Sequence, residues 1–106
     1  MSTTQDFAEY VCEQIRDAGA VRSRKMFGEY MVYVNDKPIL LVCDNTVFVK
    51  QVEAVADILK DADVGFPYTG AKLHYVLDID DAVLSNEVVR ILEPITLVPK
   101  PKKKKA

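Results

Sequence analysis

The side chains best suited to chemistry are one histidine and a cluster of aspartates. His74 is the only histidine, so a transition-metal site is not expected. A histidine base also needs a nucleophile and an orienting carboxylate, and no such set surrounds His74 in the sequence. Asp78, Asp80 and Asp81 could bind a hard cation, but acidic residues ahead of a helix also stabilise its positive end, and we adopt that explanation. We expect no bound metal and no catalytic residues.

The remaining reactive residue types are few and scattered. Cys12 and Cys43 are too few for a disulfide scaffold or a zinc site, and we expect both to pack as small apolar side chains. The four glycines are dispersed, so no phosphate-binding loop is present. We therefore expect a protein that is not an enzyme and holds no cofactor.

Positive charge and large apolar side chains concentrate in one short run, Arg22-Ser23-Arg24-Lys25-Met26-Phe27-Gly28-Glu29-Tyr30. One interpretation buries Met26 and Phe27 and leaves the basic residues solvated. The other makes the run a recognition edge, where Arg24 offers a bidentate fork to a carboxylate or a phosphate. Gly28 inside a strand pattern indicates a bulge or a close backbone approach.

The charge is unevenly distributed along the 106 residues. Five lysines follow residue 99, which leaves nine basic against sixteen acidic residues, a net charge of −7, in residues 1–99. An acidic body repels phosphate backbones, whereas a lysine tail adds only nonspecific attraction. We expect a single domain over 1–99 and a disordered basic tail over 100–106. Weak nonspecific nucleic-acid binding stays open as an alternative, through Arg22, Arg24, Lys25, Lys102, Lys103, Lys104 and Lys105.

The first half of the chain predicts one helix followed by a meander of strands. Apolar residues at helical spacing predict a helix over 5–18, capped by Thr3 or Thr4 and followed by Gly19. Period-two alternation then predicts strands near 22–27, 29–35, 38–43 and 46–50. The pairs Asn35-Asp36 and Asp44-Asn45 suit tight hairpin turns. The strand over 38–43 is apolar on both faces and should be central.

The second half is less regular. We predict a helix over 51–61, a strand over 73–79, and a last helix that starts at Ser85 or Asn86 and kinks at Pro94. Together the elements form a two-layer α+β domain, with an antiparallel sheet of five to six strands packed by about three helices.

No run approaches the roughly 20 apolar residues that a membrane span needs. The first residues also lack the basic and apolar regions of a signal peptide. We expect a cytoplasmic protein that does not bind membranes.

A family resemblance begins in the basic run. Residues 24–30, followed by Val32-Tyr33, resemble the Arg-x-Met-Phe-Gly-Gly-Tyr signature of the TfoX/Sxy N-terminal domain family, with Glu29 in place of the second glycine. Residues 47–50 look like the Leu-Tyr-Leu-Lys strand of that family, and Phe66-Pro67-Tyr68 looks like its Pro-Phe-x-Tyr turn. The resemblance covers about residues 5 to 98.

The resemblance implies a fold similar to secretion-chaperone-like domains, which often dimerise, so a homodimer is expected. It also implies a transcriptional co-regulator of natural competence and DNA uptake that contacts transcription machinery or a cyclic-AMP receptor protein-like regulator. Longer family members carry a further helical domain, so an adaptor role in another pathway stays open. The expected binding surface comprises Arg24, Met26, Phe27, Gly28, Tyr30, Lys50, Phe66 and Tyr68.

Overall fold

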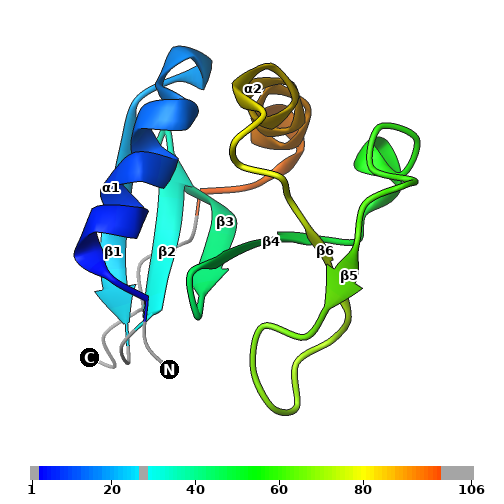
Figure 1. Cartoon of the computed structure of the whole chain (residues 1–106). Helices are drawn as coiled ribbons and strands as arrows, with labels where there is room; N and C mark the ends of the chain where they lie inside the picture. Colours follow the sequence, from blue (N-terminus) through cyan, green and yellow to red (C-terminus); the bar gives the residue numbers. More distant parts are fainter. Residues whose placement is uncertain (1–2, 27–28, 99–106) are drawn as a thin grey trace, which may run out of the picture.

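The computed structural model describes residues 3–26 and 29–98 (Figure 1). Within these residues the chain forms two α-helices, six strands and three short 3-10 helices. No helix in the described ranges is long and apolar enough to cross a membrane. In chain order the elements are α1 (Gln5–Gln14), η1 (Arg16–Ala18), β1 (Val21–Met26), β2 (Glu29–Val34), β3 (Lys37–Cys43), β4 (Thr46–Lys50), η2 (Glu53–Val55), β5 (Val64–Gly65), β6 (His74–Val76), α2 (Ala82–Leu92) and η3 (Glu93–Ile95).

The six strands form one antiparallel sheet in the order β1-β2-β3-β4-β6-β5. The helices α1 and α2 pack on one face of it (Figure 1). This arrangement confirms the predicted two-layer α+β class and the five to six strands. The sequence predicts about three helices, and the described residues contain two α-helices.

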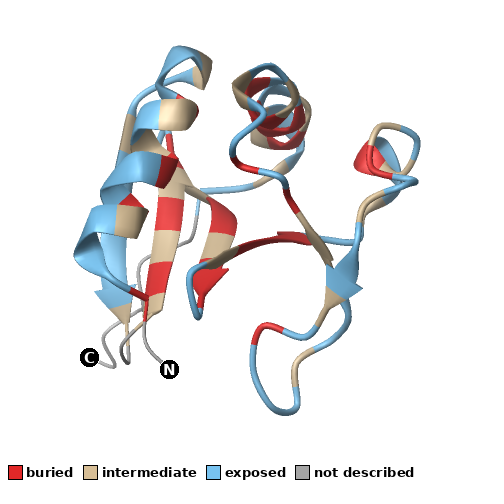
Figure 2. Cartoon of the chain, viewed as in Figure 1, coloured by how far each residue is buried: buried red, intermediate tan, exposed pale blue. Residues whose placement is uncertain are grey.

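The core lies between the sheet and the helices. Burial alternates along β2, where Tyr30, Val32 and Val34 face the helices and Met31 and Tyr33 face the other way (Figure 2). The central strand is β3, as predicted, with four of its residues buried: Ile39, Leu40, Val42 and Cys43. The helices contribute Ala8, Val11, Val88, Val89 and Leu92 to the same cluster.

Local signals correctly place the start of α1 and the turns of the β2–β3 and β3–β4 hairpins. The Thr4 hydroxyl accepts a hydrogen bond from the Phe7 N–H at 3.2 Å, which confirms the predicted cap. The pairs Asn35-Asp36 and Asp44-Asn45 all have positive φ, between 53° and 67°, as a two-residue hairpin turn of the mirror-image type requires. The predicted helix over 5–18 ends as an α-helix at Gln14 and continues as the 3-10 turn η1.

The predicted helix over 51–61 is wrong. Only Glu53–Val55 is helical, as a 3-10 turn, and most backbone bonds up to residue 62 span three residues instead of four. Val55 and Leu59 are nevertheless buried, at 0% and 1% exposure. The tighter turns therefore satisfy the apolar pattern without an α-helix.

The C-terminal part also differs from expectation. Asp81 caps α2 by accepting the Leu84 N–H at 3.0 Å, whereas the predicted caps Ser85 and Asn86 lie buried inside the helix. At Pro94 the α-helix stops instead of kinking, because η3 replaces it and Thr96 is extended. The strand predicted over 73–79 is limited to β6.

Candidate binding surface

The sheet face opposite α1 and α2, called here the open face, is covered by neither of the two described α-helices. Directly opposed residues of an antiparallel pair share a face, so the strand registers define rows across it. One row runs across five strands and consists of Arg24, Met31, Leu41, Phe48 and Val76. The middle of the open face is therefore apolar, with a guanidinium at its β1 edge.

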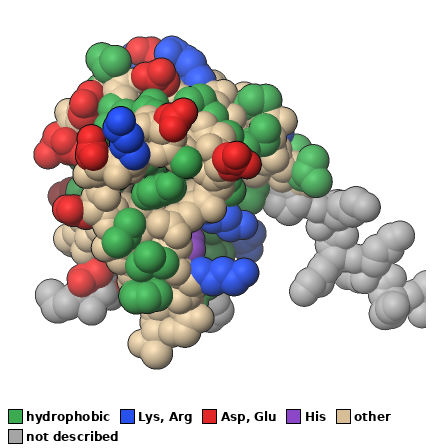
Figure 3. All heavy atoms as spheres, turned by 90° about the vertical axis from the view of Figure 1, so that its right-hand side faces the viewer, with side chains coloured by type: hydrophobic (Ala, Val, Ile, Leu, Met, Phe, Trp, Pro, Cys, Tyr) green, Lys and Arg blue, Asp and Glu red, His purple; other side chains and the backbone are tan. Residues whose placement is uncertain are grey.

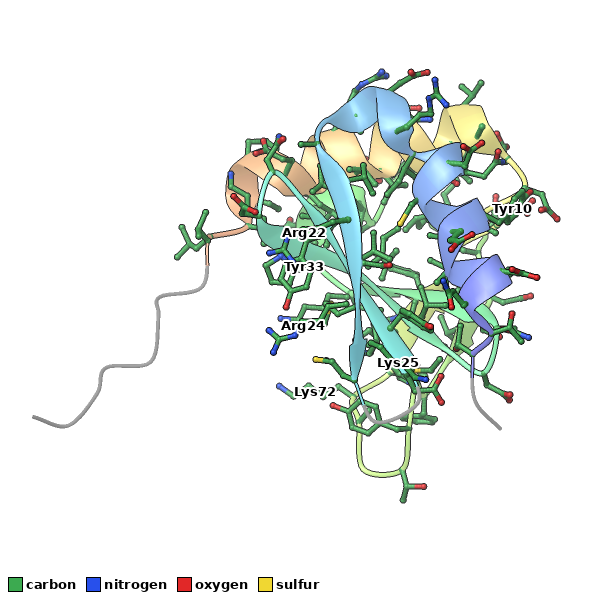
Figure 4. All side chains as sticks on the ribbon, turned by 90° about the vertical axis from the view of Figure 1, so that its left-hand side faces the viewer. Tyr10, Arg22, Arg24, Lys25, Tyr33 and Lys72 are labelled. Atoms are coloured by element: carbon green, nitrogen blue, oxygen red, sulfur yellow. The ribbon has the colours of Figure 1, made fainter. Side chains whose placement is uncertain are left out.

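Two basic residues of β1 lie on the open face and one does not. Arg22 and Arg24 project with Tyr33 and Lys72 away from the helices, whereas Lys25 projects on the helix side (Figure 4). Arg22 stacks over the Tyr33 ring at 4.4 Å and pairs with Asp36 at 3.4 Å. The run that looks continuous in sequence is therefore divided between two faces.

A groove of about 800 Å³ occupies the open face between β3, β4, the 68–72 loop and the segment after α2. Phe48 and Leu41 contribute to it, and Lys50 lies opposite His74 at one end. The His74 ring meets Phe48 edge-on at 6.3 Å between centroids. The lining comprises Met31, Pro38, Ile39, Leu40, Leu41, Phe48, Lys50, Val52, Tyr68, Gly70, Ala71, Lys72, His74, Leu92, Ile95, Thr96 and Leu97.

Charge separates between the groove and the rest of the body. The described residues that line the groove include no aspartate or glutamate, although the chain contains sixteen. Figure 3 shows Lys and Arg side chains beside the histidine, while most of the Asp and Glu side chains in that view lie toward the upper left. Arg24, Lys50 and Lys72 form no ion pair with any described residue.

Some of the predicted surface residues lie together on the open face, and others do not. Arg24, Met26 and Lys50 lie on the open face, and Tyr68 lines the groove from the loop. Phe66 is 63% exposed on the same loop, beside Tyr68.

Tyr30 is not on the open face, because it faces the helices and is 8% exposed. Phe27, Gly28 and the lysines 102–105 lie outside the described residues. Lys72, Met31, Leu41 and Phe48 were not in the predicted set. The alternation of 29–35, 38–43 and 46–50 could have indicated the last three, because it puts them on the face opposite the buried valines.

The residues considered for catalysis have structural partners. The Nδ1 of His74 lies 2.7 Å from the Lys72 carbonyl oxygen, and a carbonyl only accepts, so Nδ1 carries the proton. Asp78 accepts the Asp80 N–H, Asp80 accepts the Tyr10 hydroxyl, and Asp81 caps α2. No group of three or more metal-ligating side chains comes together within 3–26 and 29–98.

Both cysteines are free thiols. Cys43 is buried, and desolvation, with the nearby carboxylates of Glu29 and Asp44, raises its pKa to about 11. Desolvation is also the largest influence on Cys12 and raises its pKa. Neither thiol is activated as a nucleophile, since activation requires a lowered pKa.

Comparison with known proteins identifies a family and a relative. Residues 13–90 match the TfoX N-terminal domain. The chain is also 33% identical over 107 residues to a Spirochaeta aurantia protein named "Uncharacterized 12.7 kDa protein in trpE 5'region", and the match covers 99% of this chain and 93% of that protein.

Proposed function

The chain belongs to the TfoX N-terminal domain family, and from that premise we propose that it is a regulatory protein-binding domain whose contact surface is the open face of its sheet. The single observation that supports this proposal is the groove on that face. Its apolar floor lies beside lysine and arginine side chains that form no ion pair with any described residue. Apolar centres edged by polar or charged groups are typical of protein-binding surfaces.

The proposed biological role is co-regulation of transcription, of the kind that controls competence and DNA uptake. In this role the domain would bind a transcription component such as a cyclic-AMP receptor protein-like regulator. An arginine beside methionine and aromatic side chains is the composition that interface hot spots favour. Arg24, Met31 and Tyr33 provide it on the open face.

We also propose that the domain has no catalytic activity of its own. His74 packs against Phe48 and hydrogen-bonds a backbone carbonyl, and within 3–26 and 29–98 no carboxylate hydrogen-bonds its ring. The aspartates near α2 serve as a cap and as turn acceptors. These contacts give His74, Asp78 and Asp81 structural roles.

The test is cross-linked affinity purification from the native host with tagged full-length protein. Wild type should recover RNA polymerase or a DNA-binding regulator, and Arg24→Glu/Lys50→Glu should lose it, because both residues are on the open face. The matched control is Arg16→Glu/Lys60→Glu, which changes the net charge equally at exposed positions outside the groove. Recovery of no transcription component by wild type, or equal recovery by both variants, would contradict the proposal.

A further inference from the structure

The side chains that line the open-face groove restrict which ligands it can bind. Its floor consists of aliphatic, thioether and aromatic groups, including Met31, Leu41 and Phe48. Its far wall is formed by the segment after α2, where Ile95 and Leu97 remain 54% and 83% exposed. A ligand that fills it must therefore bury apolar surface, which is the main source of binding free energy.

Cations stand at the edge of that apolar floor. Lys50 and Lys72 line the groove, and Arg24 ends the row that crosses it. A second hollow of comparable size, about 660 Å³, lies elsewhere on the molecule and is lined instead by Asp61, Asp63, Asp78 and Asp80. Two hollows of similar size thus differ in the sign of the charged side chains that line them, and only the open-face groove is complementary to an acidic ligand.

We propose that the open-face groove binds an acidic segment of the partner protein, with an apolar side chain on the floor and carboxylates paired with Lys50, Lys72 and Arg24. This inference rests on the proposed function and adds the chemistry of the partner. An exposed ion pair contributes at most about fivefold in affinity, so the apolar anchor supplies most of the binding. The cations supply the selection for acidic sequences.

The same cations could attract phosphates, but the groove favours a protein ligand. Residues 1–99 carry a net charge of −7, which repels a nucleic acid with many phosphates more strongly than a peptide with two or three carboxylates. The aliphatic wall at Ile95 and Leu97 has no use in contacts to a phosphate backbone.

The lysines that follow Val98 in sequence add charge of the same sign. The described chain leaves α2 along the groove wall at Thr96 and Leu97. Five added lysines in the sequence would speed the approach of an acidic segment by long-range attraction, without the specific contacts of the groove. Removal of residues 99–106 should therefore lower the association rate at low salt and leave the dissociation rate unchanged.

The test uses displayed random peptides selected against the full-length chain. Synthetic copies of the enriched peptides are then measured by fluorescence anisotropy. We expect enrichment of sequences that combine aspartate or glutamate with a leucine or an aromatic residue. Lys50→Glu/Lys72→Glu should weaken their binding by about a hundredfold, roughly tenfold for each reversed charge. Lys60→Glu/Arg90→Glu makes the same change in net charge outside the groove and should have an effect below about threefold.

A second pair of variants tests the apolar wall. Leu97→Asp places a carboxylate in the groove, whereas Val83→Asp does so on α2, at nearly equal exposure of 83% and 80%. Only Leu97→Asp should weaken binding, by about tenfold. Circular dichroism should show all four variants folded, since each replaced residue is exposed.

Several results would overturn the proposal. They are enrichment of neutral or basic peptides, equal effects of the two double variants, and loss of all selection on removal of residues 99–106. Displacement of the peptides by a short DNA duplex, with the same dependence on Lys50 and Lys72, would identify nucleic acid as the ligand instead. If host partners are recovered through the open face but acidic peptides do not bind, the proposed function stands and only the acidic chemistry fails.

Discussion

At the scale of single residues, Glu29 joins two parts of the chain that are distant in sequence. Its Oε1 accepts hydrogen bonds from the Thr3 hydroxyl at 2.6 Å, the Thr3 N–H at 3.2 Å and the Asp44 N–H at 2.9 Å. This ties the segment before α1 to the β3–β4 turn. Glu29 occupies the position where the resembled signature has its second glycine. In this chain the carboxylate at that position therefore accepts hydrogen bonds that a glycine could not.

These contacts predict a pH dependence of stability. Desolvation would raise the pKa of Glu29, but the hydrogen bonds from Thr3 and Asp44 together outweigh it and lower the pKa below the usual 4.5. A carboxyl with a lowered folded-state pKa stabilises the fold above its unfolded pKa, and this is lost as pH falls through the folded value. Urea denaturation should show stability falling as pH drops below about 4.5, with a shallower fall for Glu29→Gln. Equal slopes for the two proteins would disprove the assignment.

Gly19 has a conformation and a position that other residues cannot adopt without cost. Its φ is +153°, and an added Cβ would lie 2.9 Å from the Asn35 side chain. That side chain accepts the Ala20 N–H at 3.0 Å, so it cannot move freely. Gly19→Ala should lower the free energy of unfolding by about 1–3 kcal/mol in urea titration. Gly65→Ala is the control, because its Cβ would meet Phe48 at an ordinary 3.5 Å, and it should change stability by less than about 0.5 kcal/mol.

At the scale of elements, the hairpins show how far local sequence determines structure. Asn and Asp tolerate the left-handed conformation, and all four turn residues adopt it. Each two-residue turn fixes which residues face each other beside it, in the β2–β3 and β3–β4 pairs. The β2–β3 register then shifts between Val32 and Tyr33. Turn chemistry and period two were therefore enough to predict these four strands, but not the register shift in the β2–β3 pair.

The β2–β3 turn provides a direct test. Asp36 has φ of 67° and its side chain forms only an exposed contact with Arg22. Asp36→Val forces a β-branched residue into the left-handed region and should cost about 1–2 kcal/mol in thermal or urea unfolding. Asp36→Gly removes the same ion pair without the backbone strain, and should leave stability within about 0.5 kcal/mol of wild type. Equal losses in both variants would assign the effect to the ion pair.

The elements that sequence did not predict lack such local signals. Over 51–61 the apolar residues have helical spacing, but the backbone forms mostly 3-10 turns. These turns bury Val55 and Leu59 as an α-helix would. Near Pro94 the apolar residues continue, but Ile95, Leu97 and Val98 are exposed, so the pattern did not indicate a core-facing helix. Both errors arise because the spacing of apolar residues indicates which side chains are favourably buried. It does not indicate which backbone hydrogen bonds form.

At the scale of the whole molecule, the candidate surface depends on register between distant strands. Arg24 and Lys50 were identified from sequence, but Lys72 comes from a loop whose position no local pattern predicts. Tyr30 was misplaced because the signature run alternates between two faces, so its neighbours Arg24 and Met31 share a face that Tyr30 does not. The sequence therefore indicated which residue types form the surface, and the pairing of the strands determined which individual residues lie on it.

The ends of the sheet determine how copies of the chain can associate. The edge strands are β1, with six residues, and β5, with two, so β1 is the edge that could pair with a second copy. Antiparallel pairing of two β1 strands would bring Arg22, Arg24 and Lys25 of each copy close together. Like charges facing each other oppose the dimer that the family resemblance suggests, and salt screens this repulsion.

We therefore expect sedimentation equilibrium to give a monomer of 11.9 kDa at low ionic strength and a growing dimer fraction as salt increases. Arg24→Glu/Lys25→Glu should strengthen the dimer at low salt, because Arg22 of one strand can then pair with glutamates of the other. The same double change at Lys60 and Arg90, away from β1, should leave the monomer unaffected at low salt. A wild-type dimer that dissociates as salt is added would show instead that opposite charges hold the copies together, through a contact between the basic open face and the acidic surface of the body.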